Sequence, residues 1–321
     1  MKKKEETKKA VHAGINLASS MGIGTISCTG MIPAATDGLL EVEGFASETG
    51  VKLSTGHETV VVAFALNVDI ALEAAGRFSL SKEHVACIGL GRIGGAHLRL
   101  QLGLKHFPAS LTLVDIPSKR KVLEKLATEL CTSYSFPLDR LFIVTADPLK
   151  GLPKNFYDTT TLYFGATSAA DVLDINQVRP GAVIVDDSFP TCFNLNQAIQ
   201  RAQQKGDFIA TIAGALGSLP EIKHHLVVDT SYSVLQNSSP FPNTLTGCIA
   251  SVAVLNQLNL PLSIGKPREQ IILEKYYSFK AHGITGSPMY LFRFDAVQEK
   301  GPLKYQGDYL ESFRARFHSK L

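Results

Sequence analysis

The chain has 321 residues, which is long enough for two domains that each bury a sizeable core. Hydrophobic residues make up 45% of the chain and charged residues 19%, a balance typical of globular proteins rather than disordered ones. The formal net charge of +3 at pH 7 is small and evenly spread, so the charge predicts no binding to nucleic acid.

The termini and cysteines narrow the class of protein further. The basic run MKKKEETKK is typical of a solvated, frayed terminus, and no apolar segment of a secretory signal follows it. The longest apolar stretch is interrupted by Asn67, Asp69 and Glu73, which favours a buried helix over a membrane span. The five cysteines are scattered without a CxxC pair, so we expect reduced thiols in a cytoplasmic enzyme and neither disulfides nor a zinc site.

The elements expected along the chain alternate between strand and helix. Residues 52–76 read as one long helix, and Thr55-Gly56-His57-Glu58 matches a capping box with Thr55 as the N-cap. Helical patterns recur at 118–134 and 194–206. Six short apolar, β-branched runs read as strands covered on both faces, at 84–90, 110–116, 140–146, 160–166, 182–188 and 208–214.

This alternation predicts an α/β fold with a Rossmann-type, doubly wound parallel sheet. After about residue 235 the pattern is helical again. We therefore expect an NAD(P)-binding domain at 81–230 between an N-terminal segment, 1–80, and a C-terminal segment, 231–321. The two flanks are expected to pack together as a second, substrate-binding domain.

A glycine fingerprint, Gly89-x-Gly91-x-x-Gly94, follows the first predicted strand and opens a helix. In this context the glycines permit the tight turn, the approach of the pyrophosphate and close helix–strand packing. Arg92 and Ile93 lie between them, at the helix N-terminus whose N–H groups face the phosphates. The pattern predicts an NADH or NADPH site; the alternative is a glycine-rich turn that binds no ligand.

The end of the second predicted strand bears on which cofactor binds. Asp115 stands where a carboxylate can bind the ribose 2′-hydroxyl, which favours NADH. Lys119 and Arg120 follow, and such groups can hold the 2′-phosphate of NADPH. They can equally be the solvated first turn of a helix.

Two further loops are expected to reach the cofactor, because ligands bind at the carboxyl ends of such strands. Thr167 and Ser168 follow the fourth predicted strand and are expected to contact the nicotinamide half. Asp186 and Asp187 end the fifth, where they can lie beside the cofactor or cap the next turn.

Cys248 lies in the stretch SSPFPNTLTGCIASVAVLNQL, residues 238–258, which reads as a turn followed by an apolar helix. It can be a core thiol, since free cysteines are often buried. With Asn243 or Thr244 as the N-cap, it can instead be a nucleophile whose pKa the helix dipole lowers. It is expected, with Leu255, to border an apolar stripe on the helix side that carries Leu245, Ile249, Val252 and Asn256.

Several stretches, in order, also resemble one known family. They are MGIGTISCTGMIP, LSTGHETVVVAFALNVDIALEAAG, the glycine fingerprint, PGAVIVDDSFP, IAGALGS and GCIASVAVL. Together they resemble the cyanobacterial-type long-chain acyl-[acyl-carrier-protein] reductases, which form fatty aldehydes, over roughly residues 10–260. By this resemblance the chain begins inside the family pattern, with about 75 or more family residues preceding it.

The resemblance implies that Cys248 accepts the acyl group and that acyl carrier protein or a CoA thioester brings it. It also implies NADPH, although Asp115 stands where the family has a neutral residue. His57, offset from the family's histidine, can act as base for the thiol or acid for the leaving group, or simply start its helix.

The resulting hypothesis is reduction of a fatty acyl thioester to an aldehyde through a cysteine acyl-enzyme. A dehydrogenase of the amino-acid or shikimate type, which needs no cysteine, is the alternative within enzymes. A non-catalytic NAD(P)-sensing module is the alternative outside them. The sequence leaves a homo-oligomer possible.

Overall fold

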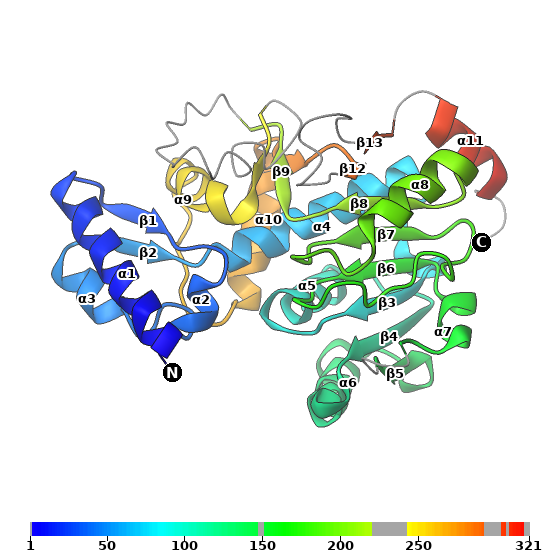
Figure 1. Ribbon diagram of the computed structural model, residues 1–321, viewed down its shortest axis with the longest axis horizontal. Helices are drawn as coiled ribbons and strands as arrows, with labels where there is room; N and C mark the ends of the chain where they lie inside the picture. Colours follow the sequence, from blue (N-terminus) through cyan, green and yellow to red (C-terminus); the bar gives the residue numbers. More distant parts are fainter. Residues whose placement is uncertain (1, 147–150, 220–242, 292–302, 306–307, 318–321) are drawn as a thin grey trace.

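In the computed structural model, residues 2–146, 151–219, 243–291, 303–305 and 308–317 are described. The chain forms two lobes joined by one long helix (Figure 1). The N-terminal lobe, blue in that view, lies beside a Rossmann domain coloured cyan to green. None of the helices in the described ranges is long and apolar enough to cross a membrane.

The N-terminal lobe is built around a short parallel pair of strands. Its elements are α1 (Lys2–Ser20), β1 (Thr25–Ser27), α2 (Ile32–Ala35), α3 (Glu43–Glu48) and β2 (Lys52–Ser54). Strand β1 pairs with β2, and α1 and α3 pack over them around the buried side chains of Ile15, Leu39 and Val42.

The connecting helix, α4 (His57–Ala74), starts later than the pattern predicts. Residues 52–54 are held extended by pairing with β1, and Gly56, in the left-handed conformation, is the N-cap. The predicted capping box is therefore wrong. The Thr55 hydroxyl accepts a hydrogen bond from the His57 N–H at 3.2 Å, while the Glu58 carboxylate turns to Lys275 instead.

The Rossmann domain contains a six-stranded sheet in the order β5-β4-β3-β6-β7-β8, with every neighbouring pair parallel. This order reverses between β3 and β6, which opens a crevice at the carboxyl ends of the strands. All six predicted strands are confirmed. Their bounds are β3 (His84–Ile88), β4 (Ser110–Asp115), β5 (Leu141–Thr145), β6 (Leu162–Gly165), β7 (Val183–Asp186) and β8 (Ile209–Ile212).

Helices cover the sheet on both faces, as its nearly continuous apolar strands require. They are α5 (Arg92–Gly103), α6 (Arg120–Tyr134), α7 (Lys154–Thr159) and α8 (Leu195–Lys205), with short 3-10 turns η1 (Leu80–Lys82), η2 (Pro117–Lys119) and η3 (Leu138–Arg140). The predicted helices at 118–134 and 194–206 are confirmed as α6 and α8. Helix α4 packs against α5 and β7, so it covers part of the sheet itself.

The C-terminal segment serves both lobes. Strand β9 (Ala215–Gly217) precedes it, and its own elements are β10 (Leu245–Thr246), α9 (Gly247–Gln257), α10 (Glu269–Ala281), β11 (Thr285–Gly286), β12 (Tyr290–Leu291), β13 (Leu303–Lys304) and α11 (Asp308–Phe317). Helices α9 and α10 pack against α4, as expected for flanks that join. Further on, the Tyr305 hydroxyl donates to the Ala210 carbonyl at 2.8 Å, so the chain returns to the edge strand β8. The expected boundary at 230 and 231 lies outside the described residues.

Candidate functional site

The glycine fingerprint forms the turn between β3 and α5. Gly89 has φ +85°, and a Cβ there would lie 2.5 Å from the Ala166 carbonyl oxygen, so only glycine fits. A Cβ on Gly94 would collide with the Gly89 carbonyl oxygen. Gly91 is different, because a Cβ there would meet no atom within 4 Å. The space beside Gly91 is therefore open for a ligand to approach the backbone.

A cavity of about 220 Å³ adjoins this turn at the carboxyl ends of the strands. It is lined by Asp115 at the end of β4 and by Gly89, Ala146 and Thr167, which follow β3, β5 and β6. Asp115 is 8% exposed, and its carboxylate accepts hydrogen bonds from the N–H groups of Leu90 at 3.1 Å and Ile116 at 2.9 Å. The turn, the cavity and this carboxylate fit the adenosine half of NADH or NADPH.

Lys119 and Arg120 are both paired with carboxylates. The Lys119 ammonium lies 3.1 Å from Asp115 Oδ2, and the Arg120 guanidinium lies 3.1 Å from Glu124 Oε1, one turn along α6. Arg120 therefore matches the alternative in which it belongs to a solvated first helical turn. Lys119 lies next to a residue that lines the cavity, because its ammonium is paired with Asp115.

Arg92 reaches from the start of α5 to the N-terminal lobe. Its guanidinium lies 2.7 Å from Asp37 Oδ1 and donates to the Gly265 carbonyl at 3.3 Å. Ile93, beside it, packs its side chain against the hydrophobic cores on both sides of α5. Only the backbone of Ile93 can therefore face a phosphate, while Arg92 also ties the two lobes together.

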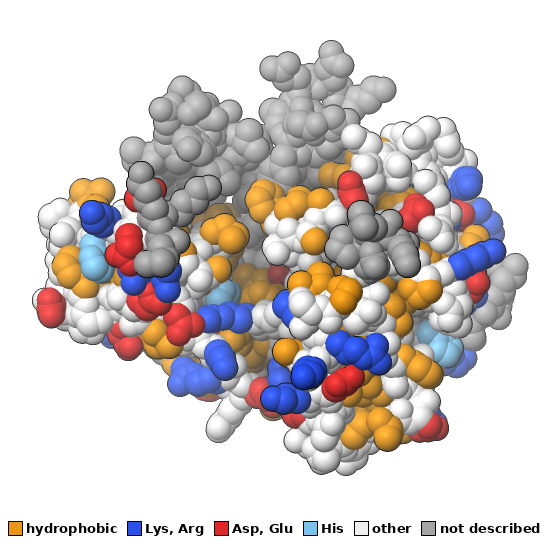
Figure 2. All heavy atoms as spheres, turned by 60° about the horizontal axis from the view of Figure 1, so that its bottom comes forward, with side chains coloured by type: hydrophobic (Ala, Val, Ile, Leu, Met, Phe, Trp, Pro, Cys, Tyr) orange, Lys and Arg blue, Asp and Glu red, His pale blue; other side chains and the backbone are white. Residues whose placement is uncertain are grey.

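Between the lobes, Arg92 at the start of α5 meets Asp37 and Gly265, and Gly56 before α4 meets Cys248 at the start of α9; we call this region the furrow. Figure 2 shows this side of the molecule, with lysine and arginine side chains on both sides of the furrow. Acidic side chains lie among them in the same view (Figure 2), so the rim carries both signs of charge.

His57 is the first residue of α4 and is half-buried. Burial, together with the positive charge of Arg92, lowers the pKa of its imidazole to about 4. Its Nδ1 atom is buried and has no hydrogen-bond partner among the described residues. The ring is therefore neutral at pH 7, with one nitrogen unused by the fold.

Cys248 lies at the meeting point of two helix starts. It is the second residue of α9, whose N-cap is Thr246, so the predicted caps at Asn243 and Thr244 are wrong. Strand β10 pairs with β9 and keeps Thr246 extended, which delays the helix. A Cβ on Gly56, just before α4, would lie 2.6 Å from the Cys248 Cα atom. The thiol is partly exposed, unlike a core cysteine.

The state of this thiol differs from the expectation. Burial, and then other groups that include the carboxyl of Asp187, raise the pKa of Cys248, although the Thr246 hydroxyl and the N–H groups of Cys248 and Ile249 oppose the rise. The expected lowering by the helix start is outweighed, so the resting thiol is protonated at pH 7.

The predicted apolar stripe is also wrong. Ile249, which it contained, is 45% exposed. The buried face of α9 comprises Gly247, Ala250, Ser251, Val254 and Leu255. Small residues lead this face because α4 and β1 approach closely, and the hydroxyls of Ser27 and Ser251 donate to the Cys248 carbonyl at 2.7 and 3.0 Å.

The two aspartates after β7 have different surroundings. Asp186 is fully buried and accepts hydrogen bonds from the N–H groups of Ser188 at 3.1 Å and Cys192 at 2.9 Å, so it caps the turn. Asp187 is partly exposed, and its carboxyl fills the space that Gly214 leaves free of a side chain. From the sequence, Asp187 was expected either to lie beside the cofactor or to cap the next turn. Its position at the end of a predicted strand was the feature that pointed to these roles.

The loops after β6 and β7 are joined at this edge of the sheet. The Ser188 hydroxyl accepts a hydrogen bond from the Thr167 N–H at 2.9 Å, and the Thr167 hydroxyl accepts one from the Ala169 N–H at 3.1 Å. Ser168, between them, is exposed. Thr167 lines the cavity beside Asp115, whereas contact of either residue with a nicotinamide stays a prediction.

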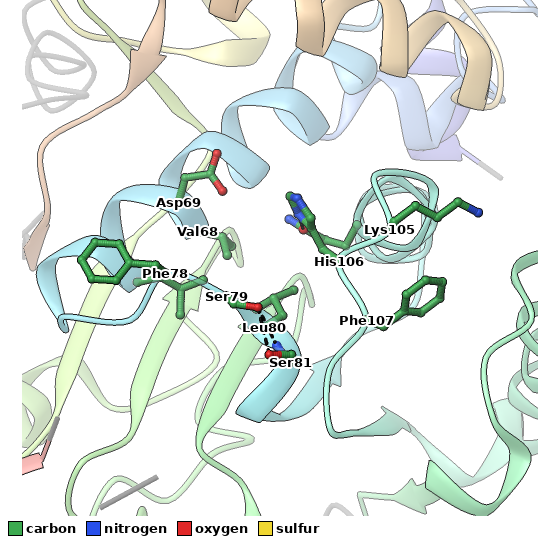
Figure 3. A pocket seen from close by; sticks show the side chains of 11 residues that line it. Val68, Asp69, Phe78, Ser79, Leu80, Ser81, Lys105, His106 and Phe107 are labelled. Carbon is green, nitrogen blue, oxygen red and sulfur yellow. Dashed lines mark hydrogen bonds between the residues drawn. The ribbon is translucent and has the colours of Figure 1, made fainter. Parts of the chain in front are cut away.

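A separate cavity of about 340 Å³ lies at the opposite edge of the sheet, between the end of α5 and the turn before β3. Figure 3 shows Phe78, Ser79, Lys105 and His106 around it. Asp69 also lines it, but the hydroxyl of Tyr276 donates to its carboxylate at 3.1 Å. Because this cavity lies at the amino ends of the strands, it is not part of the furrow.

No protein-family model matches the chain, and no curated protein matches it in sequence. Solved structures do. They include a dipicolinate synthase chain from Bacillus halodurans, with 13% identity over 53% of each chain and a TM-score of 0.34. L-tryptophan dehydrogenase from Nostoc punctiforme matches with 17% identity over 52% of this chain and 44% of its own, at a TM-score of 0.33.

Salmonella D-lactate dehydrogenase matches with 13% identity over 74% of this chain and 85% of its own, at a TM-score of 0.34. The matches to the first two structures span only about half of their lengths, 53% and 44%. Likenesses this distant bear on the fold alone. By its own strand order, glycine turn and crevice, the chain has a Rossmann-type domain whose site fits NAD(P)H.

Proposed function

We propose that this protein is an NAD(P)H-dependent oxidoreductase that reduces a fatty acyl thioester to an aldehyde through an acyl-enzyme on Cys248. The observation that carries the proposal is the position of a partly exposed cysteine at the start of α9, against the turn that follows β8. Nicotinamide dinucleotides bound at such a fingerprint run along this carboxyl edge of the sheet.

The residues present support dinucleotide binding. Gly91 faces open space, and the N–H groups at the start of α5 are placed as phosphate-binding helix starts are. Asp115 lines the neighbouring cavity, where its carboxylate can accept a hydrogen bond from a ribose hydroxyl. When bound, the reduced nicotinamide supplies the hydride.

We further propose that NADH is preferred to NADPH. The 2′-phosphate of NADPH would stand in place of the ribose hydroxyl that the Asp115 carboxylate can bind, and two neighbouring negative groups repel each other. Lys119, which could offset this, is already paired with the same carboxylate, and Arg120 is paired with Glu124.

The chain's own chemistry then follows from Cys248. Its thiolate attacks the carbonyl carbon of the thioester, the bond to the carrier sulfur breaks, and the acyl group stays on Cys248. The amides of Cys248 and Ile249, in the first turn of α9, favour negative charge at the sulfur. Release of the aldehyde after reduction returns Cys248 as thiolate, and the full turnover consumes one proton.

His57 contributes a neutral imidazole beside this chemistry. A pKa of about 4 makes it a hydrogen-bonding group at pH 7 and leaves almost none of it protonated to act as an acid. This lowered pKa argues against the role of acid for the leaving group, and the role of base for the thiol stays a prediction.

One observation favours a second candidate, a dehydrogenase of carboxylate substrates such as amino acids. His57 and the cationic Arg92 influence each other at the furrow, and an arginine can hold a carboxylate beside a histidine that relays a proton. Against it, Arg92 is paired with Asp37, and the neighbouring carboxylate of Glu58 is bound to Lys275 rather than to His57.

A turnover panel separates the two. Purified protein with NADH or NADPH is given acyl-CoAs of several lengths, 2-oxo acids with ammonium, and 2-oxo acids alone. Aldehyde from the acyl-CoAs, lost in Cys248→Ser and kept in Cys131→Ser, supports the proposal, since Cys131 is the other partly exposed cysteine. Turnover of 2-oxo acids that survives Cys248→Ser overturns it in favour of the second candidate.

A further inference from the structure

The carboxyl of Asp187 occupies a space that the fold keeps open for it. Asp187 follows β7 at the carboxyl edge of the sheet. Gly214, after β8, has φ +81°, and any side chain on it would collide with the Asp187 carboxyl. A residue other than glycine at 214 would therefore displace this carboxyl or strain the backbone.

The same turn holds the start of α9. The Gly214 carbonyl accepts a hydrogen bond at 2.7 Å from the N–H of Gly247, the residue before Cys248. A Cβ on Gly247 would lie 3.1 Å from that carbonyl oxygen, so the helix start and the turn are in close contact. Asp187 and the start of α9 thus both adjoin the Gly214 turn, and the negative charge of Asp187 contributes to the raised pKa of Cys248.

The carboxyls of Asp186 and Asp187 also differ in the hydrogen bonds that they accept. Asp186 accepts two backbone N–H groups, whereas within the described part of the chain no group donates to the Asp187 carboxyl. Burial, and then the charge of Asp186, raise the pKa of Asp187 well above that of an ordinary aspartate. A raised pKa makes the carboxylate a stronger base, better matched to a thiol.

We infer that Asp187 takes the proton of the Cys248 thiol during acylation and passes it to the departing carrier thiol. This inference rests on the proposed function. The S–H bond of Cys248 breaks as its sulfur bonds to the acyl carbon, and the proton moves to the carboxylate. The bond from that carbon to the carrier sulfur then breaks, the carrier sulfur takes the proton, and Asp187 is again a carboxylate.

The second half of the turnover needs no change at Asp187. Release of the aldehyde leaves Cys248 as thiolate, which takes one proton from water, so acylation begins again from a thiol and a carboxylate. His57 is a weaker base for this transfer, because its pKa is about 4 and the positive charge of Arg92 disfavours its protonation.

The test is the pH dependence of Cys248 acylation by dodecanoyl-CoA in full-length wild type and Asp187→Asn, without nicotinamide, followed as intact protein mass after rapid quenching. At pH 7 we expect Asp187→Asn to acylate about 100-fold more slowly, the usual scale of general base catalysis. Above the thiol pKa the two rates should converge, because the thiolate then forms without a base.

A second readout is iodoacetamide alkylation of Cys248 against pH. Removing a nearby negative charge should move its midpoint to lower pH in Asp187→Asn, even though acylation at pH 7 is slower. If Asp187 were merely structural, Asp187→Asn would not combine a lower alkylation midpoint with slower acylation at pH 7. Its acylation rate would also not return to the wild-type rate at high pH. Asp158→Asn, which removes an exposed carboxylate on α7, should match wild type in both.

The two proposals fail in different ways. A wild type that acylates, with Asp187→Asn equal to it in acylation at pH 7 and in alkylation midpoint, overturns the role of Asp187 and leaves the proposed function standing. A wild type that forms no acyl adduct at any pH, while Cys248 still alkylates, overturns the proposed function itself.

Discussion

Replacing Lys275 by methionine should destabilise the protein strongly, because it would leave a buried carboxylate without its nearest, buried countercharge. Lys275 Nζ and Glu58 Oε2 are 2.6 Å apart, and both side chains are 1% exposed. Through this pair α10 holds the first turn of α4, where His57 begins the helix.

The expected loss of unfolding free energy depends on which partners the Glu58 carboxylate keeps in the variant. In Lys275→Met its carboxylate would retain the Ser263 hydroxyl, the Arg268 N–H at 3.1 Å and, at 3.7 Å, the exposed guanidinium of Arg268. Breaking a buried pair on one side costs about 3–5 kcal/mol, and the remaining partners put the expected loss near about 3 kcal/mol. The double variant Glu58→Gln/Lys275→Met buries no charge and should recover at least half of that loss.

Urea unfolding followed by far-UV circular dichroism measures these free energies, since the chain has no tryptophan to report by fluorescence. Lys280→Met, on the same helix, is the control. Lys280 is 53% exposed and 3.4 Å from Asp69, so its loss should cost less than about 1 kcal/mol. A Lys275→Met variant no less stable than Lys280→Met, or a double variant no better than the single, would refute the reasoning.

The remaining predictions concern the furrow. Gly91→Ala should keep the wild-type melting temperature but weaken cofactor binding at least about tenfold, whereas Gly94→Ala, which collides with backbone, should unfold at lower temperature. Calorimetric titration and thermal melts measure both, and unchanged binding in Gly91→Ala would contradict the site. Asp115→Asn should weaken NADH binding by about 10–100-fold and NADPH binding by less, as titrations of both cofactors would show. The imidazole of His57 has a pKa of about 4 in the folded protein against 6.5 in the unfolded chain, so the unfolded state takes up its proton first as pH falls. The free energy of unfolding of the wild type should therefore fall as the pH is lowered from 6.5 to 4. Over that window His57→Gln should lose up to about 3 kcal/mol less of it than the wild type, as measured by urea unfolding at each pH. Equal losses in the two proteins would refute this.

The Rossmann domain was predictable because its signals are local. Each strand is a short apolar run whose neighbours in the chain already mark its ends, and the spacing from Gly89 to Gly94 encodes one turn between β3 and α5. The fit of Asp115 to the cavity followed from its place at the end of β4.

What the sequence missed depends on partners far along the chain. Glu58 satisfies the spacing of a capping box, yet its carboxylate pairs with Lys275, 217 residues later, and a buried countercharge outweighs an N-terminal cap. The start of α9 moved to Gly247 because pairing of β10 with β9 holds the preceding residues extended. Neither pairing leaves a signal within one helix's length of sequence.

Asp187 was hidden for the same reason. Its carboxyl is defined by the absence of a side chain at Gly214 and by the contact of that turn with α9. Sequence alone shows two adjacent aspartates at a strand end, and only the packing separates the one that caps the turn from the one whose carboxyl lies against Gly214.

The most direct test of the central claim follows the acyl group and the hydride together. Protein is acylated with dodecanoyl-CoA, the adduct is mapped by peptide mass spectrometry, and NADH deuterated at the transferred position is then added. The account predicts an adduct on the peptide that contains Cys248, lost on addition of cofactor as deuterated dodecanal appears in equal amount. Deuterated aldehyde formed by Cys248→Ser, or an adduct on Cys248 that persists with NADH and with NADPH, would contradict it.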